Sequence, residues 1–415
     1  MITTLPPLGR PDTAARPKNS GDSPRPARRW DWPVLLVCAV SALAVGLASP
    51  PDTSQQAWGL ASALGYGCAG LVALKSAPWA PRVAVIAVVG SVLVPLLYLT
   101  VIGKAQMEVG VVERGAELLF SSGTPYSATP HIVRDFNPYL PGMAVFGIPH
   151  MVFGDGPLSS ARLWFAVGFL AAVVGAVRVL AGGKRGVDDV EDGGVSSRRA
   201  RAGAGVLWLI ACPVVALPLT IGGVDPPVIG LICLALAFAH RGDAGRAGLV
   251  LGAAAALKWT AWPAIPVIVA LFAVRGGTRA AVRCAAGAVG IAVLTALPVL
   301  LVDRAAFYQN VVLYPLGLGP TASSAQSPLL GHLIVSLVPN GESVTMGLIA
   351  LSAVGVGASL LVRPPRTATA AADRLALGLL LAIALSPATR VGYAVYPVVL
   401  LAWPRFAARI SAGQP

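Results

Sequence analysis

Apolar residues occupy most of this chain in long stretches with few interruptions, not in the short amphipathic segments of a soluble protein. A helix needs about 20 apolar residues to cross the hydrocarbon core of a bilayer, and stretches near that length recur throughout. They lie near residues 34–49, 57–74, 82–102, 138–153, 163–181, 203–219, 226–240, 247–274, 284–302, 343–362, 371–386 and 389–407. The pattern predicts an all-α fold, a polytopic transmembrane bundle of about 11–13 helices.

The N-terminal segment has a different composition. Residues 1–30 are rich in Pro, Arg, Ser and Asp, a composition that predicts disorder because too little apolar surface is available for burial. No clear cleavage site with small residues follows the first apolar stretch, so this stretch is predicted to remain as the first helix. Residues 31–410 are predicted to form a single transmembrane domain.

Two of the apolar stretches contain residues that interrupt a helix. The 247–274 stretch holds Lys258 and several Trp and Pro residues near its middle, so we expect two short helices that enter the membrane and return. The 138–153 stretch is short and holds Pro138, Pro141 and Pro149. We expect this segment to dip into the membrane and return without crossing it.

The basic residues predict the topology, because cytoplasmic loops of membrane proteins are enriched in Lys and Arg. Basic residues gather in the N-terminal tail, in the C-terminus, and in the segments 75–82, 182–201, 240–246, 275–283 and 363–374. All of these lie in the cytoplasm together if 138–153 does not cross; if it crosses, every later basic loop faces outside. The first arrangement places a multi-pass protein in the plasma membrane with both termini cytoplasmic. It also places large polar loops, 103–137 and 303–342, on the outer side.

Composition and charge exclude several classes of protein. The chain of 415 residues is 56% hydrophobic and 12% charged, with a mean hydropathy of +0.74, whereas a soluble domain carries roughly twice that share of charge. The net charge of +13 comes from short loops and not from a basic stripe with interleaved aromatic residues, so no nucleic-acid partner is expected. Five cysteines without a CxxC pair and four scattered histidines predict no metal site and no cofactor.

The first outer loop carries the most distinctive polar pattern. Apolar residues between Ala105 and Leu119 recur at helical spacing, which predicts an amphipathic helix at the membrane interface that ends near Gly123. Glu108 lies close to the end of the preceding membrane helix, where a carboxylate can accept a proton from a hydroxyl as a general base. Glu113 is the alternative base, and Glu117 is expected on a solvated helix face.

The order of these motifs resembles a known family. Glu108, Gly115-Ala116, Leu118-Leu119, Gly123, Pro125 and Tyr126, followed by NPYLPGMAVFGIP at 137–149, are similar to the first outer loop of GT-C class glycosyltransferases, and of glycosyltransferase family 87 in particular, which includes mycobacterial mannosyltransferases. Residues 222–263, 325–333 and 386–401 resemble further family segments in the same order. The family's acid is usually Asp, whereas this chain has Glu108, so an inactive member is an alternative.

The resemblance implies a GT-C fold and an inverting transfer of a sugar, mannose being favoured, without a cofactor. The donor would be a polyprenyl-phosphate sugar, and the acceptor a lipid or cell-envelope glycan at the outer face of the membrane. Lys258 and Arg390 would bind the donor phosphate. Asp225, Gln326, His332 and Tyr393 would bind the sugar or the acceptor.

Simpler interpretations of these residues remain open. Asp225 could cap the helix that follows it, Lys258 could extend to the interface, Arg390 could anchor the topology, and His332 could cap a short re-entrant helix. The competing functional classes are a transporter or lipid flippase and a non-catalytic membrane partner. A transporter is expected to hold its polar residues in mid-membrane, whereas clustering in the outer loops favours the enzyme.

Overall fold

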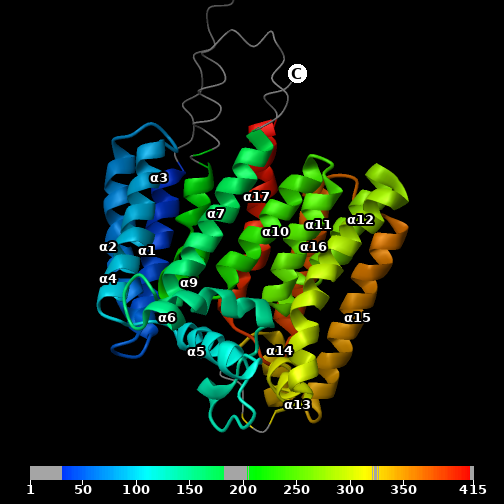
Figure 1. The fold of residues 1–415 in the computed structure, drawn as a ribbon. Helices are drawn as coiled ribbons and strands as arrows, with labels where there is room; N and C mark the ends of the chain where they lie inside the picture. Colours follow the sequence, from blue (N-terminus) through cyan, green and yellow to red (C-terminus); the bar gives the residue numbers. More distant parts are fainter. Residues whose placement is uncertain are drawn as a thin grey trace, which may run out of the picture.

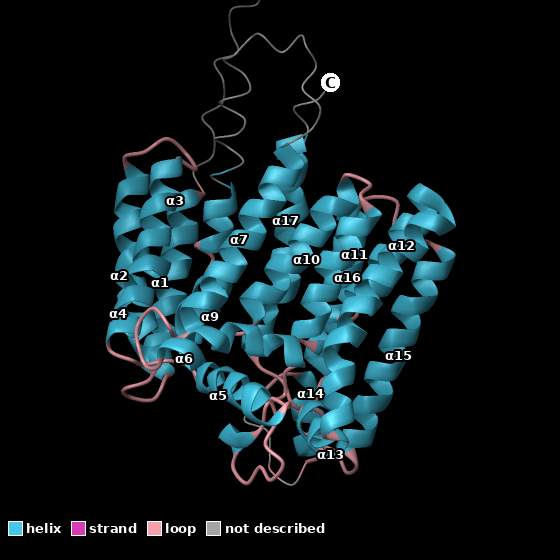
Figure 2. Cartoon of the chain, viewed as in Figure 1, coloured by secondary structure: helices cyan, strands magenta, loops and turns pink. Residues whose placement is uncertain are grey.

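The structure, a computed structural model, describes residues 30–181, 203, 205–319, 321, 325 and 327–411, and all regular elements in these residues are helices (Figure 2). The long helices run roughly parallel and antiparallel in one bundle, whereas short helices and loops gather at one end of it (Figure 1). This end carries the helix α5 (Met107–Ser122), and we call it the α5 face. The N-terminal tail, which was predicted to be disordered, and the basic segment 182–201, which was predicted to be cytoplasmic, lie outside the described residues.

The bundle helices follow the apolar stretches of the sequence. Seven of the described helical segments are long and apolar enough to cross a membrane by length and composition, and four more are shorter apolar helices. The bundle consists of α1 Asp31–Ala48, α2 Ser54–Leu74, α3 Pro81–Val88, α4 Val94–Val101, α7 Ala161–Ala181, α9 Pro213–Ile221, α10 Asp225–His240, α11 Ala244–Leu257, α12 Ala264–Val302, α15 Gly341–Val362, α16 Ala368–Leu385 and α17 Val395–Ser411. The predicted all-α, multi-pass bundle is confirmed.

The elements of the α5 face are short. They are α5 Met107–Ser122, the 3₁₀ helices Val133–Asp135, Pro141–Gly147, Trp259–Ala261 and Val391–Ala394, α6 Ile148–Phe153, α13 Arg304–Phe307, the π-helical turn Tyr308–Leu313 and α14 Leu330–Leu337. A second π-helical turn, Val89–Leu93, joins α3 to α4 within the bundle.

The segment 138–153 begins and ends at the α5 face. Its 3₁₀ helix and α6 both pack against α5, and the Leu140 amide donates to the Leu257 carbonyl at 3.1 Å. A Cβ on Gly147 would meet the Val112 carbonyl oxygen at 2.5 Å, so only glycine permits this close approach to α5. The segment therefore does not cross the bundle, as its three prolines predicted.

The predicted break in the 247–274 stretch is present. Lys258 has an extended backbone at φ −158°, ψ 146°, and it ends α11 before the 3₁₀ turn and α12. The first part of α12 then returns to the opposite face, where Arg275 donates to the carbonyl of Ala239 near the end of α10. The positive φ of Gly277, +74°, divides α12 at that face, so the basic segment 275–283, expected to be a loop, is helical on both sides of one glycine.

The helix α5 lies across the α5 face at an angle to the bundle (Figure 1). It begins at Met107, two residues after the Ala105 of the predicted amphipathic pattern, because the Gln106 amide donates to the Ile221 carbonyl at 2.9 Å and Gln106 is extended. Gly123, in the left-handed region at φ +78°, ends the helix as predicted. The buried positions Val109, Val112 and Ala116 form the packed side.

Candidate active site

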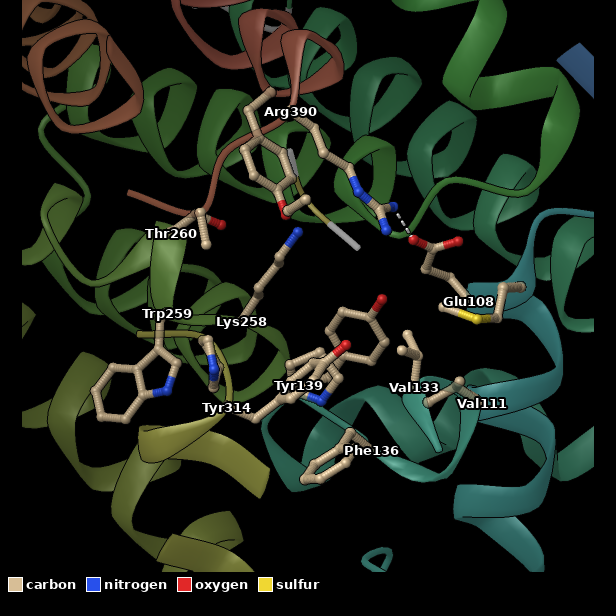
Figure 3. A pocket seen from close by; sticks show the side chains of 16 residues that line it. Glu108, Val111, Val133, Phe136, Tyr139, Lys258, Trp259, Thr260, Tyr314 and Arg390 are labelled. Atoms are coloured by element: carbon tan, nitrogen blue, oxygen red, sulfur yellow. Dashed lines mark hydrogen bonds and ion pairs between the residues drawn. The ribbon is translucent and has the colours of Figure 1, made fainter. Parts of the chain in front are cut away.

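A pocket of about 200 Å³ opens at the α5 face, where α10 begins and α11 ends. With 16 and 14 residues, these two helices rise only about 24 and 21 Å, and Asp225 and Lys258 stand at their adjacent ends. The pocket is lined by Glu108, Tyr139, Lys258, Thr260, Arg390 and Tyr393 among others (Figure 3).

Glu108 and Arg390 form an ion pair on one wall of this pocket. The guanidinium Nη1 of Arg390 donates to Oε1 of Glu108, as Figure 3 shows. Burial lowers the pKa of Arg390, but the Glu108 carboxylate, together with the nearby Tyr393 and Tyr139, outweighs this effect, and the pKa rises above its usual value. The other carboxylate oxygen, Oε2, is buried without a hydrogen-bond partner among the described residues. One oxygen of Glu108 therefore holds Arg390, and the second is free to accept a proton.

Lys258 lies across the pocket from this pair (Figure 3) and has its own carboxylate partner. Its Nζ is 2.5 Å from Oδ1 of Asp225, and both residues are 8% exposed. The Tyr396 hydroxyl is 2.7 Å from the same Asp225 oxygen and 2.6 Å from the Thr260 hydroxyl. Because a buried charge is costly unless it is paired and hydrogen-bonded, this network explains how a lysine can be kept charged at the end of an apolar helix.

Aromatic side chains pack around the ammonium group of Lys258. Its Nζ lies 4.8 Å from the ring centroid of Tyr393 and 5.7 Å from that of Tyr139, within the range of a cation–π interaction. Burial raises the pKa of Tyr139 well above its ordinary value, with a smaller contribution from the Glu108 charge. The Tyr139 phenol therefore remains protonated and can donate a hydrogen bond into the pocket.

The loop 124–140 is held as a wall of the pocket by contacts to the 303–319 segment. The Asn137 amide donates to Oδ1 of Asn310 at 2.9 Å, and the rings of Phe136 and Tyr314 stack with centroids 4.3 Å apart. The Tyr126 hydroxyl donates to the carbonyl of Tyr139 at 2.9 Å. The two predicted outer loops are thus joined at the pocket.

The structure brings together four of the residues selected from the sequence. Glu108, Lys258, Arg390 and Tyr393 line the pocket, although they come from three separate segments, Arg390 and Tyr393 sharing one turn. Asp225 lies behind Lys258, and it does not cap α10, which has no side-chain cap hydrogen bond. The capping interpretation of Asp225 is therefore wrong. Lys258 is 8% exposed, so it does not extend to the interface.

The other candidates lie elsewhere. Glu113 accepts a hydrogen bond from the Ala161 amide at 2.9 Å and faces a different hollow. His332 is on α14, which packs against α15 and α16, and it does not line the pocket described here. Gln326 lies outside the described residues. The side chain of Glu117 is 51% exposed, in accordance with the predicted solvated face.

Sequence reasoning did not select Tyr139, Thr260 or Tyr396. Tyrosines near membrane ends are common as interfacial anchors, so nothing in the sequence marked these tyrosines as pocket residues. The pairing of Asp225 with Lys258 had a usable signal, because α10 and α11 are consecutive antiparallel helices and these residues stand at their adjacent ends. Within the described residues, no cluster of three His, Cys, Asp or Glu side chains could hold a metal ion.

Comparisons with known proteins give one family and one fold resemblance. No curated protein matches the chain. The crystal structure of ArnT from Cupriavidus metallidurans in the apo state is similar at 16% sequence identity and a TM-score of 0.45, covering 74% of this chain and 55% of that one, so the chain spans about half the length of that protein. The model of glycosyltransferase family 87 matches residues 137–387, which include Asp225 and Lys258 but neither Glu108 nor Arg390. With more than half of its length matched, the chain belongs to glycosyltransferase family 87.

Proposed function

We propose that this membrane glycosyltransferase moves a sugar, mannose being favoured, from a polyprenyl-phosphate donor to a lipid or cell-envelope glycan acceptor at the outer face of the plasma membrane. The observation that carries the proposal is the composition of one pocket. It presents the unpartnered Oε2 of Glu108 beside two cations, Arg390 and Lys258. A carboxylate and two cations are the groups that such a transfer requires.

The proposed transfer is a single displacement at the anomeric carbon. The acceptor hydroxyl gives its proton to Oε2 of Glu108, and its oxygen forms a bond to the anomeric carbon. The bond from that carbon to the phosphate oxygen breaks, and the lipid phosphate leaves with the electron pair. Because the acceptor attacks from the face opposite the leaving group, the anomeric configuration inverts.

Arg390 and Lys258 would stabilise the negative charge that develops on the leaving phosphate. Arg390 uses Nη1 for Glu108, and a guanidinium has five N–H donors arranged in a rigid fork that matches phosphate oxygens. Lys258 is held in place by Asp225 and stays desolvated at 8% exposure, and preorganised charges are most effective in such a water-poor site.

A second hollow gives the acceptor a separate approach to Glu108. It measures about 640 Å³ and is lined by the α1–α2 connection, including Asp52, Thr53 and Gln55, and also by Glu108 and Arg390. The ion pair therefore stands between two cavities. A general base must contact the acceptor while facing the donor carbon, and access to Glu108 from both cavities supports this role for it.

The positions of buried charges favour an enzyme over a transporter. Among the described residues, the buried charged side chains are Asp31, Glu108, Arg162, Asp225 and Lys258. Asp31 begins α1 and accepts a hydrogen bond from the Trp79 amide, and the other four lie at the α5 face. A carrier of the kind with broken helices would hold charges near the bilayer midplane.

The donor assignment is tested by transfer from a purified polyprenyl-phosphate mannose to a membrane glycolipid extract. The protein is reconstituted in vesicles without nucleotide sugar. Labelled product should form with the lipid-linked donor alone and should be absent when only a nucleotide sugar is supplied. Product that forms only from the nucleotide sugar, in vesicles that cannot synthesise lipid-linked sugar, would contradict the proposal.

A further inference from the structure

A third cavity, a polar hollow distinct from the two described above, lies beside α5 on the side that carries Val109, Gly110 and Glu113. It measures about 760 Å³ and is bordered by the start of α5, by the turn before α7 and by Arg162 at the second position of α7. The hollow includes Arg114, Arg134, His150 and Arg162 as potential cations, against Glu113 and Asp155 as acids. It is therefore a predominantly basic hollow, and we call it the Arg162 groove.

Arg162 is the unusual residue of this groove. It is 2% exposed, and its Nε and Nη1 are buried without a hydrogen-bond partner among the described residues. Its stem packs over Gly222, where an added Cβ would meet the Cβ and Cγ of Arg162 at 3.3 Å. The side chain is thus fixed by packing, while its donors lack acceptors. A buried guanidinium in this state carries a large desolvation cost.

The neighbouring acids do not satisfy Arg162. Glu113 uses Oε1 to accept the Ala161 amide, and no ion pair within 4.0 Å joins Arg162 to any acid in the part of the chain that the structure describes. Asp155 is fully exposed and lies 3.8 Å from His150. The cation at the base of the groove therefore lacks a contacting anion from the protein.

The rim of the groove adds positive charge without closing it. Arg114 is exposed and donates through Nη2 to the carbonyl of Arg134, which ties it to the 3₁₀ helix Val133–Asp135. Both arginines belong to elements of the α5 face and are exposed, so an anion that approaches from solvent meets them before it reaches the buried Arg162. The arrangement has an exposed basic rim and a buried basic floor.

We propose that the Arg162 groove binds a phosphate group, with Arg162 at its floor and Arg114 and Arg134 at its rim. Arginine forms charge-assisted hydrogen bonds with phosphate oxygens, and a phosphate in the groove would supply the anion that the described residues do not place in contact with Arg162. The phosphate can belong to a lipid headgroup at the membrane surface or can be a free anion. This binding site does not depend on the proposed sugar transfer, because it is separate from the pocket that holds Lys258.

The test measures binding to the purified full chain in a zwitterionic detergent at low salt. Three probes are used: dihexanoyl phosphatidic acid, dihexanoylglycerol with the same acyl chains and no phosphate, and inorganic phosphate. We expect phosphatidic acid to bind and the glycerol lipid not to bind. If inorganic phosphate displaces phosphatidic acid at a concentration similar to that of the lipid, the ligand is a free anion. If inorganic phosphate displaces it only weakly, the ligand is a lipid headgroup.

Variants then assign the binding to the groove. Arg162→Gln should weaken phosphatidic acid binding at least tenfold, a loss on the order of one charge-assisted pair, and Arg162→Lys should give an intermediate loss because it keeps the charge without the fork. Arg246→Gln, an exposed arginine at the opposite face, is the matched control and should bind as the wild type does. If Arg162→Gln does not fold, the double variant Arg114→Gln/Arg134→Gln should still weaken binding severalfold.

Wild-type affinity for phosphatidic acid in folded Arg162→Gln would overturn the proposal, and so would wild-type affinity in the double variant Arg114→Gln/Arg134→Gln. The proposal is also overturned if the wild-type protein binds none of the phosphate probes. Because binding is measured without sugar transfer, an inactive protein that still binds phosphate leaves this proposal standing. An active protein without phosphate binding removes it while leaving the proposed function intact.

Discussion

Glu108 and Arg390 are 282 positions apart in the chain, and their side chains form an ion pair on one wall of the pocket at the α5 face. The pair joins the first turn of α5 to the turn that precedes the last helix. It leaves one oxygen of the carboxylate buried and without a hydrogen-bond partner among the residues that the structure describes. The proposed chemistry depends on this arrangement, because the same contact orients the base and places a cation beside the leaving group.

Removing one partner of the buried pair of Asp225 and Lys258 is predicted to destabilise the fold strongly. Asp225→Asn or Lys258→Met alone leaves a buried charge without its partner, and the expected loss is about 3–5 kcal/mol in the free energy of unfolding. The double variant should recover much of this loss, since no lone charge remains. Unfolding in mixed micelles with increasing SDS measures the difference.

The control for that prediction is a pair at the surface. Lys104 and Asp52 are 3.0 Å apart, and the side chain of Asp52 is 92% exposed. Asp52→Asn should change the free energy of unfolding by less than about 1 kcal/mol, as is usual for exposed pairs. Equal effects of Asp52→Asn and Asp225→Asn would mean that burial does not strengthen the Lys258 pair.

Arg390 should contribute its geometry as well as its charge. Arg390→Lys keeps a cation but loses the fork that can bind Glu108 and phosphate together, so kcat should fall and the KM for the lipid-linked donor should rise. Arg390→Gln should reduce transfer further. The Glu108 carboxylate raises the pKa of Arg390, so its charge should not change between pH 6 and 9. Wild-type kcat and KM in Arg390→Lys would contradict this assignment.

The sidedness of the bundle is tested by labelling. Ser122→Cys lies on an exposed position at the end of α5, and Arg366→Cys lies between α15 and α16 at the opposite face. A membrane-impermeant maleimide should label position 122 in intact cells and position 366 only after permeabilisation. Cys68 is exposed on α2, so a Cys68→Ser background is used. Labelling with the reverse pattern would place the α5 face in the cytoplasm.

Most of the fold could be predicted from the sequence because membrane helices are specified locally. Continuous apolar stretches define the spans. The prolines of 138–153 predicted that this segment does not cross the bundle, and the polar interruption at Lys258 predicted that the chain turns back there. The structure has both features. The loop expected at 275–283 is instead helical on either side of Gly277, because one residue with positive φ is enough to reverse direction.

The site was only partly predictable because its contacts are not local. Glu108, Lys258, Arg390 and Tyr393 were selected one at a time for their chemistry, and the structure places them in one pocket. Partners could not be chosen in the same way: the sequence favoured a lipid phosphate as the partner of Lys258, whereas Asp225 contacts it. His332 was selected for its residue type and its place in the segment 325–333, and the packing of α14 leaves it outside the pocket.

The central claim is that Glu108 is the general base, and the measurement that tests it most directly is the transfer rate of Glu108→Gln from a lipid-linked donor. Glutamine keeps the size and can still contact Arg390, but it cannot take the proton, so kcat should fall by about 10²–10⁴-fold with donor binding little changed. Glu113→Gln, which can still accept the Ala161 amide, and the exposed Glu117→Gln should remain close to wild-type activity. Full transfer activity in Glu108→Gln would contradict the account. So would a loss of transfer activity in Glu113→Gln that Glu108→Gln does not share.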